Sequence, residues 1–227
     1  MKTTISYLSI FSILFFLASC GGGETAESSA EENTMEDSDA NNSDKAELTG
    51  DYVLNTDESL LMWEGNMLKV GGVSLYGHNG TMKFLKGMIN FENGSIKGGT
   101  LVVDMTSITP TDENYDPEED RTKAKLIGHL SSDDFFAVKE HPVANYELKG
   151  GDMSGVKGLM TIRGITKSES IRDLKMIDNG DQVTIKGMMT IDRQKYNVAF
   201  EMPAEDKVLS DDLDLEFKVV LEKQKTS

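Results

Sequence analysis

Residues 213–221 read LDLEFKVVL. Every second residue from Leu213 to Leu221 is apolar, so these side chains share one face of an extended chain. The charged residues Asp214, Glu216 and Lys218 lie on the other face. Such alternation is typical of a β-strand that is buried on one side only. The stretch therefore predicts a sheet with one apolar face and one solvated face.

The same period of two recurs along the rest of the chain, between turn signals such as Asn93-Gly94 and Asn179-Gly180. The expected strands cover residues 59–67, 80–91, 96–105, 143–150, 156–162, 168–177, 183–191 and 213–221. Only Thr122–Leu130 lacks alternation and is expected to be helical. Regularly spaced strands indicate a sandwich or a barrel, and closure into a barrel is favoured because it removes exposed strand edges. The fold class is therefore all-β, with eight antiparallel strands and a short helix.

Two of these strands have nearly the same sequence, KGLMTI at residues 157–162 and KGMMTI at residues 186–191. Methionine and isoleucine are expected to point inward, and lysine and threonine outward. Gly158 and Gly187 fall on the inward side, where a glycine weakens a strand unless the strand bends or something lies close to its backbone. Methionine suits an adaptable apolar cavity. A core filled by the protein's own side chains fits the same pattern, so both readings stay open.

The first residues have the layout of a signal peptide, with Lys2, an apolar run and then small residues. Leu17-Ala-Ser-Cys20 resembles the lipobox of bacterial lipoproteins, which implies cleavage after residue 19 and acylation of Cys20, for example with palmitate. Acyl chains would anchor the exported protein to a bacterial membrane. Gly21 is not the aspartate that retains some lipoproteins in the inner membrane, which favours the outer membrane, facing the periplasm or the cell surface.

Residues 20–50 are rich in Glu, Asp, Ser and Asn and predict a disordered acidic tether after Cys20. Residues 51–223 then form one domain, followed by a tail at residues 224–227. The whole chain has a net charge of −16, which argues against a nucleic-acid partner and against charge-driven binding to anionic membranes. Cys20 is the single cysteine, so the domain cannot contain a disulfide.

Five motifs stand out along the chain: Asp104 with Ser107-Ile108, the turn His129–Phe136, His141-Pro142, the stretch Gly158–Thr166, and Asp192-Arg193. These motifs resemble those of the YceI-like family of exported lipid-binding domains. They follow one another in the order of the family, across the chain from about Tyr52 to Leu221. The chain departs from the family in a longer segment at residues 109–122 and in its many methionines.

The resemblance implies a lipocalin-like barrel that holds a long amphiphile, such as a polyisoprenoid, an isoprenoid quinone or a fatty-acid derivative. The protein would then act as a carrier or a sequestering protein. His129 and Asp134 are candidates for contact with the head group of the lipid. The candidate wall residues are Trp63, Phe84, Phe91, Phe135, Phe136, Met160, Ile162, Met189, Ile191, Phe217 and Val219. The alternative is a surface interaction or stress-response module whose barrel is filled.

Other chemistry finds little support in the residues. The three histidines, His78, His129 and His141, lack the spacing of metal ligands. Asp112, Asn114 and Asp116 match the first ligand positions of an EF-hand loop, but Pro117 stands where that loop needs glycine. A solvated acidic loop is the default, and a looser calcium site is the alternative. No nucleophile motif stands out, so we expect no catalytic residues, no resident metal and no cofactor.

Overall fold

The structure is a computed structural model that describes residues 48–180, 182–200 and 207–224. The predicted signal peptide, Cys20 and the tether up to residue 47 lie outside these residues, as does the tail beyond residue 224. Among the described residues, no helix is long and apolar enough to cross a membrane.

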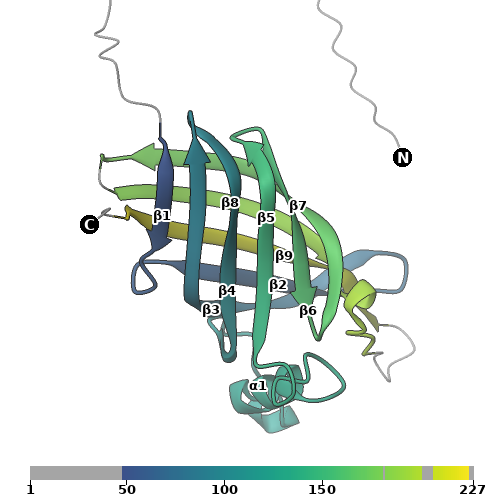
Figure 1. Ribbon diagram of the computed structural model, residues 1–227. Helices are drawn as coiled ribbons and strands as arrows, with labels where there is room; N and C mark the ends of the chain where they lie inside the picture. The colour runs from purple at the N-terminus through teal and green to yellow at the C-terminus, as the bar shows by residue number, and fades with distance from the viewer. Residues whose placement is uncertain (1–47, 181, 201–206, 225–227) are drawn as a thin grey trace, which may run out of the picture. The chain divides into compact units, whose positions relative to one another are not determined.

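Within these ranges the chain forms nine strands, one α-helix and two short 3-10 helices (Figure 1). The strands are β1 (Gly50–Leu54), β2 (Leu60–Lys69), β3 (Val73–Glu92), β4 (Ser95–Pro110), β5 (Val143–Asp152), β6 (Gly155–Ile162), β7 (Ile165–Asp178), β8 (Gln182–Asp192) and β9 (Lys207–Lys223). The helices are η1 (Pro117–Glu119), α1 (Lys123–Ser131) and η2 (Arg193–Tyr196). All eight predicted strands and the predicted helix are present, whereas the prediction missed β1.

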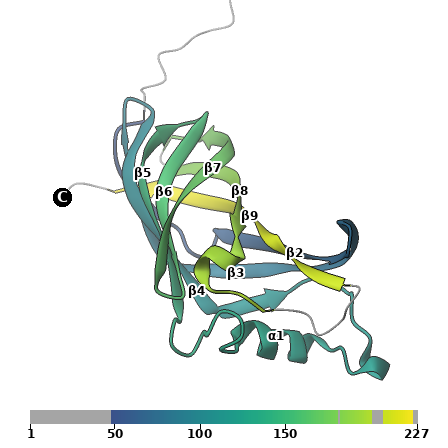
Figure 2. The same cartoon turned by 90° about the vertical axis from the view of Figure 1, so that its right-hand side faces the viewer.

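Eight of the strands close into an antiparallel barrel in the order β2-β3-β4-β5-β6-β7-β8-β9, with β9 pairing back to β2. The all-β barrel expected from the sequence is confirmed. Consecutive strands from β2 to β9 are antiparallel neighbours, so the connections between them lie alternately at the two ends of the barrel. We call the end with α1 and the β2–β3, β6–β7 and β8–β9 connections the mouth. The opposite end, with the β3–β4, β5–β6 and β7–β8 turns, is the far end (Figures 1 and 2).

The ninth strand, β1, continues the position of β2 in the barrel towards the far end. It pairs with β3 at Gly50–Val53 and with β9 at Tyr52–Leu54. Between β1 and β2, the buried Ser59 replaces the missing ladder partner of β9. Val220 N donates to Ser59 Oγ over 2.9 Å, and Ser59 Oγ donates to Asn55 O over 2.6 Å. One hydroxyl therefore satisfies the backbone where the strand is broken.

The inward face of β9 carries Leu215, Phe217, Val219 and Leu221, which are all buried, whereas Asp214 and Glu216 are exposed. The alternation predicted from LDLEFKVVL is thus confirmed. The far half of the barrel interior is filled by large side chains, among them Tyr52 and Phe91, whose ring centroids lie 5.3 Å apart. This end of the barrel is a packed core.

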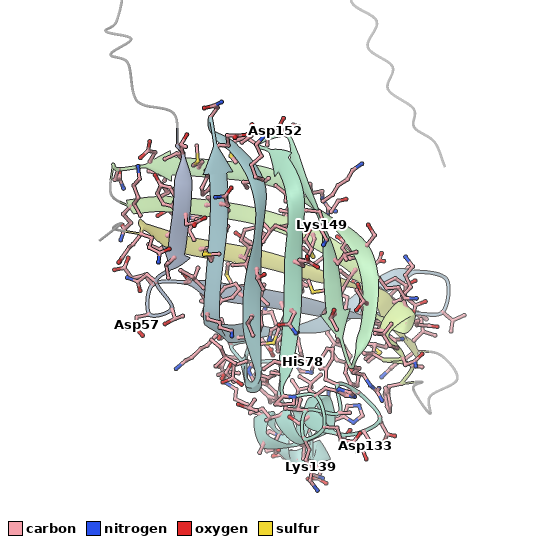
Figure 3. All side chains as sticks on the ribbon, in the orientation of Figure 1. Asp57, His78, Asp133, Lys139, Lys149 and Asp152 are labelled. Carbon is pink, nitrogen blue, oxygen red and sulfur yellow. The ribbon has the colours of Figure 1, made fainter. Side chains whose placement is uncertain are left out.

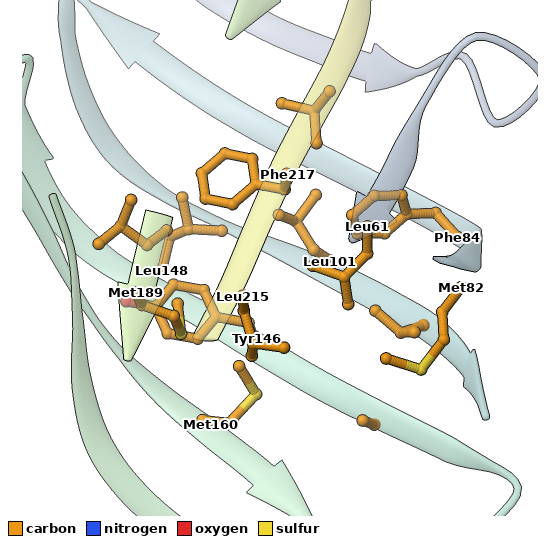
Figure 4. Packing of buried hydrophobic residues seen from close by; sticks show 14 of the residues in the cluster. Leu61, Met82, Phe84, Leu101, Tyr146, Leu148, Met160, Met189, Leu215 and Phe217 are labelled. Atoms are coloured by element: carbon orange, nitrogen blue, oxygen red, sulfur yellow. The ribbon is translucent and has the colours of Figure 1, made fainter. Parts of the chain in front are cut away.

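The two inward glycines make room for aromatic rings. A Cβ at Gly187 would lie 2.6 Å from Phe217 Cζ, and one at Gly158 would collide with the ring of Tyr146. Figure 4 shows these two rings reaching into the interior from β9 and β5. The repeated sequence Lys-Gly-apolar-Met-Thr-Ile therefore forms a strand in which the glycine lies beneath a neighbouring aromatic ring and the methionine and isoleucine point inward.

Helix α1 begins at an N-cap, Thr122, whose side chain accepts a hydrogen bond from Lys125 N at 3.3 Å. Its buried residue is Leu130, which packs in the core cluster. The helix lies across the mouth, at the bottom of Figures 1 and 2. It is followed by the turn that carries Phe135 and Phe136, both buried. The long β4–β5 connection thus brings its apolar side chains to the mouth.

Replacing Gly158 by alanine should destabilise the barrel, because the new Cβ would lie 2.6 Å from the carbonyl oxygen of Glu147, which cannot move freely. We expect a loss of about 1–3 kcal/mol in the free energy of unfolding, as for other overpacked sites. Gly155→Ala is the matched control, since its Cβ would lie 3.4 Å from the nearest atom, Ile171 O. Urea denaturation measures both. Equal stabilities of the two variants would contradict the steric account.

Ser59→Ala should cost about 1–3 kcal/mol, because Val220 N would lose its acceptor in a buried place. Ser168→Ala, at an exposed position on β7, should change the free energy of unfolding by less than about 0.5 kcal/mol. The same denaturation experiment compares them. If Ser59→Ala were as stable as the wild type, the hydroxyl would not be needed at the break.

Candidate functional site

A cavity of about 330 Å³ opens at the mouth of the barrel. Its walls come from the mouth ends of β2, β3 and β9, and helix α1 and the turn after it cover one side. Most of the surface is apolar and is provided by residues such as Trp63, Met67, Ile108, Leu126 and Phe200. Its volume falls at the lower end of the range of small-molecule sites, roughly 300–1,000 Å³.

A second cavity of about 60 Å³ lies deeper in the barrel and is lined almost entirely by apolar side chains. The two cavities share Met82, Phe136 and Leu213, so these side chains separate the mouth from the interior. Tyr146 and Phe217 contribute to the deeper wall, and Met160 and Met189 lie beside them (Figure 4). The barrel is thus hollow at the mouth, narrow in the middle and solid at the far end.

Most of the wall residues predicted from the sequence lie on these cavities. Trp63 and Phe135 line the mouth cavity, and Phe136 lines both. Five more of the predicted wall residues line the inner cavity but not the mouth cavity, namely Phe84, Met160, Ile162, Met189 and Phe217. The remaining three, Phe91, Ile191 and Val219, are buried but line neither cavity.

The two predicted head-group residues are separated by the fold. His129 lines the mouth cavity, where its ring makes edge contacts with Phe200 and Phe135 at centroid distances of 4.4 Å and 5.2 Å. Asp134 is exposed and does not line that cavity. Phe200 was not predicted, because the isolated pattern around it gives no strand or helix signal. Together His129, Phe135 and Phe200 form an aromatic rim at the mouth.

Arg163 fastens this aromatic rim to the barrel. Its guanidinium donates to the carbonyl oxygens of Phe135, of Asn197 at 2.6 Å and of Asp133 at 3.0 Å. The residue sits with Gly164 in the two-residue turn between β6 and β7, with a φ of +51° that a non-glycine residue rarely adopts. The turn tolerates this conformation while one side chain holds two separate connections in place.

A second positive group, Arg193, lines the mouth cavity while remaining 6% exposed. It donates to the carbonyl oxygens of Ser210 at 2.9 Å and Leu209 at 3.2 Å, and its Nη2 lies 3.0 Å from Asp211 Oδ1. Burial lowers the pKa of Arg193, and the nearby Asp211 and Asp192 act in the opposite direction. This arginine fixes the start of β9, and its charge is paired with Asp211 beside the cavity wall.

The acidic loop after β4 turns its first carboxylate towards the barrel. Asp112 lies 3.1 Å from His78 Nδ1 and accepts hydrogen bonds from the backbone N–H of Asn79 and Asn114. Burial raises the pKa of Asp112, but these hydrogen bonds and His78 outweigh it, so the pKa lies below its usual value. The ring of Tyr115 stacks on His78 at 5.3 Å. The loop is thereby tied to β3, and His78 lines the mouth cavity. Figure 3 shows His78 near the end of the barrel that carries α1.

Two further observations bear on the chemistry of the site. Within the described part of the chain, no group of three or more His, Cys, Asp and Glu side chains is placed to hold a metal ion. Among the same residues, Trp63 Nε1 is the one buried side-chain nitrogen or oxygen without a hydrogen-bond partner. Its indole ring packs against Gly80 on β3. Trp63 is also the single tryptophan of the chain, so its fluorescence reports on this wall of the cavity.

The comparisons with known proteins agree with this architecture. The model of the YceI-like domain matches residues 52–221. The chain belongs to the YceI-like family. No curated protein matches the sequence. The match of the family model covers every strand from β2 to β8, most of β9 and the last three residues of β1.

Several solved structures match the chain at low sequence identity. BcnA from Burkholderia cenocepacia superposes with a TM-score of 0.53 and 17% identity, over 74% of this chain and 98% of that one. A polyisoprenoid binding domain from Saccharophagus degradans, implicated in plant cell wall breakdown, gives 0.47 and 15%, over 76% and 98%. The Campylobacter jejuni YCEI protein gives 0.44 and 18%, over 60% and 80%. The likeness to BcnA supports the barrel assigned above.

The fastening role of Arg163 is testable with Arg163→Asn. Asparagine suits the positive φ of this turn better than arginine does, so any loss of stability must come from the lost carbonyl contacts. We expect a loss of about 1–3 kcal/mol and faster hydrogen exchange in residues 133–138. Arg172→Asn, on the outer face of β7, is the control and should cost less. A fully stable Arg163→Asn protein with unchanged exchange would refute the role.

Proposed function

We propose that this YceI-like protein binds one amphiphilic lipid at the mouth of its barrel and acts as a carrier or a sequestering protein. The observation behind the proposal is the apolar cavity of about 330 Å³, which Met82 and Phe136 separate from a smaller apolar cavity in the interior. A polar substrate would find few partners on such a wall. An apolar chain gains roughly 25 cal/mol for each Å² that it removes from water there.

In this proposal the apolar chain of the ligand points inward and its polar group stays at the rim. The mouth cavity has several polar and charged lining residues, whereas the inner cavity has only Asn145 and Tyr146. Those of the mouth are Tyr76, His78, His129, Arg193, Ser210 and Asp212. The candidate ligands are a polyisoprenoid, an isoprenoid quinone and a fatty-acid derivative. Each combines a long apolar chain with a small polar group, which is the distribution of surface that the cavity offers.

The volumes limit how much of such a chain enters. The inner cavity of about 60 Å³ holds little, so a longer tail enters only if flexible side chains move aside. Met82, Met160 and Met189 line the narrow part, and methionine changes conformation at low cost. We therefore propose that the ligand occupies the mouth first and reaches inward by displacing these methionines, while the far end stays closed.

The proposal extends to the position of the protein in the cell. Acylation of Cys20 would anchor the exported protein to a bacterial membrane, with the outer membrane favoured, and the acidic tether would give the barrel freedom to move. The barrel would exchange lipid without chemical conversion, so we propose no catalytic residue. Mass spectrometry of the N-terminal peptide, from protein extracted from bacterial membranes, tests the acylation. An unmodified Cys20 would remove the anchor from the proposal.

The ligand itself is tested on the intact protein. Native mass spectrometry of protein purified from its membrane, followed by lipid extraction, should reveal a bound lipid of one class. Trp63 fluorescence should then change on addition of that lipid to emptied protein. A protein that emerges empty, and whose fluorescence responds to no quinone, polyprenol or fatty acid, would overturn the proposal.

Filling the mouth cavity should block binding. Gly65 lines this cavity, and a Cβ there would meet only Leu213 Cδ1 at 3.8 Å, so a side chain can be added without backbone strain. We expect Gly65→Leu to weaken lipid binding about tenfold or more, which corresponds to about 1.4 kcal/mol or more. Gly65→Ala is the matched control, because it adds one methyl group and should bind nearly as the wild type does. Titrations followed by Trp63 fluorescence compare the variants, and unchanged binding by Gly65→Leu would place the ligand elsewhere.

A further inference from the structure

The β2–β3 hairpin carries a cluster of exposed apolar side chains beside the mouth. Val70 is 60% exposed, Val73 64% and Leu75 43%, and Val208 on the adjoining end of β9 is 44% exposed. Leu68 is the register partner of Val208 and joins the cluster to the sheet. We call these five side chains the hairpin tip. Figure 2 shows the hairpin curving away from the body of the barrel, so its tip is accessible to a large flat partner.

The charge around the hairpin tip differs from that of the rest of the chain. The chain has 39 acidic residues, yet none occurs from Gly65 to Phe91, a range that includes the turn of the hairpin and the parts of β2 and β3 next to it. Lys69 and Lys207 are register partners at the base of the tip. In this acidic protein, the turn end of the hairpin thus combines exposed apolar side chains with lysines and carries no carboxylate, and the nearest ones on β9 are Asp211 and Asp212. This combination is typical of segments that insert shallowly into the interface of a lipid bilayer.

The hairpin also forms part of the wall of the mouth cavity. Met67 and Tyr76 from the hairpin and Leu209 from β9 line the mouth cavity, a few residues from the exposed tip. Tyrosine behind an apolar tip fits the region of the lipid head groups, where one end of the side chain is wet and the other apolar. A surface that rests on the tip would therefore face the opening of the cavity.

We infer that the hairpin tip docks on a lipid bilayer, inserting Val70 and Val73 between the lipid head groups and so holding the mouth of the barrel against the membrane. The inference that lipid then passes directly between bilayer and cavity rests on the proposed function. The contact is separate from the proposed anchor, because it involves residues of the barrel and not Cys20. A few valines bind weakly alone, so the contact forms and breaks while the anchor keeps the protein near the membrane.

A second copy of the chain fits the tip less well. Stable protein–protein interfaces bury about 1,200–2,000 Å² in total, and a patch of five side chains around the turn Gly71-Gly72 is far smaller. The two glycines also present no side chains that a protein partner could recognise. A bilayer requires neither a large patch nor a complementary shape.

The insertion is tested by placing a fluorescent label at two sites. The full chain with Cys20→Ser contains no other cysteine, so Val73→Cys or Ile177→Cys can be labelled with an environment-sensitive dye. Ile177 is 57% exposed at the far end of β7 and is the matched control. With phosphatidylcholine vesicles containing some phosphatidylglycerol, emission at position 73 should rise several-fold and be quenched by nitroxide lipids. Emission at position 177 should stay unchanged.

Equal responses at the two positions, or no response at position 73, would overturn the inference. A rise at position 73 that depends on protein concentration and occurs without vesicles would also overturn it, because it would show a second copy at the tip. These readouts do not depend on whether the cavity holds a lipid. If the tip inserted into vesicles but the protein bound no lipid in its cavity, the proposed function would be refuted and the docking of the tip would be confirmed.

A pair of charge variants tests the link to lipid transfer. Val70→Asp with Val73→Asp should slow the uptake of lipid from vesicles about fivefold or more, since aspartate is repelled by the interface. Binding of the same lipid added from solution, followed by Trp63 fluorescence, should be unchanged, and Ile177→Asp should affect neither. Unchanged uptake from vesicles by the double variant would refute docking through the tip.

Discussion

Closure of the sheet is the constraint on which the other features depend. Because β9 pairs with β8 on one side and with β2 on the other, the eight strands form a ring with a fixed interior. Every inward side chain competes for that space. The ring accommodates Tyr146 and Phe217 only where Gly158 and Gly187 leave room, and it remains open at the mouth, where the inward residue Gly65 has no side chain. The cavity follows from which inward positions carry small residues.

The sequence predicted most of the fold because alternation and turn residues are local signals. The eight ring strands and the helix were found in this way, and the β1 strand was missed because five residues give too little pattern. Phe84 and Phe91 illustrate a harder case. They lie seven residues apart, so a regular strand would turn them to opposite faces, yet both are buried inside. The pairing of β3 with β4 shifts register between Phe84 and Lys86, and this bulge restores the inward direction.

The candidate site was predictable in part for the same reason. Residues on regular strands, such as Met160 and Met189, were placed on the inner wall because their parity was known. Whether an inward residue borders a cavity or a packed core depends on neighbours that are distant in the sequence, which is why Ile191 and Val219 are buried away from both cavities. Arg163 and Phe200 were missed because their contacts join connections without regular structure. Only the folded chain brings Phe135, Asn197 and the β6–β7 turn together.

Because the barrel is filled unevenly, the residues that stabilise the fold and the residues that shape the cavity lie in different halves of one interior. The far half contains the fully buried Tyr52, Phe91 and Leu221, whereas the mouth contains glycine, methionine and loosely enclosed aromatic rings. Substitutions at the mouth change what the cavity accepts without removing packing from the half that keeps the chain folded. Divergence among barrels of this design can therefore alter selectivity in small steps, each tolerated because the closed end retains its reserve of stability.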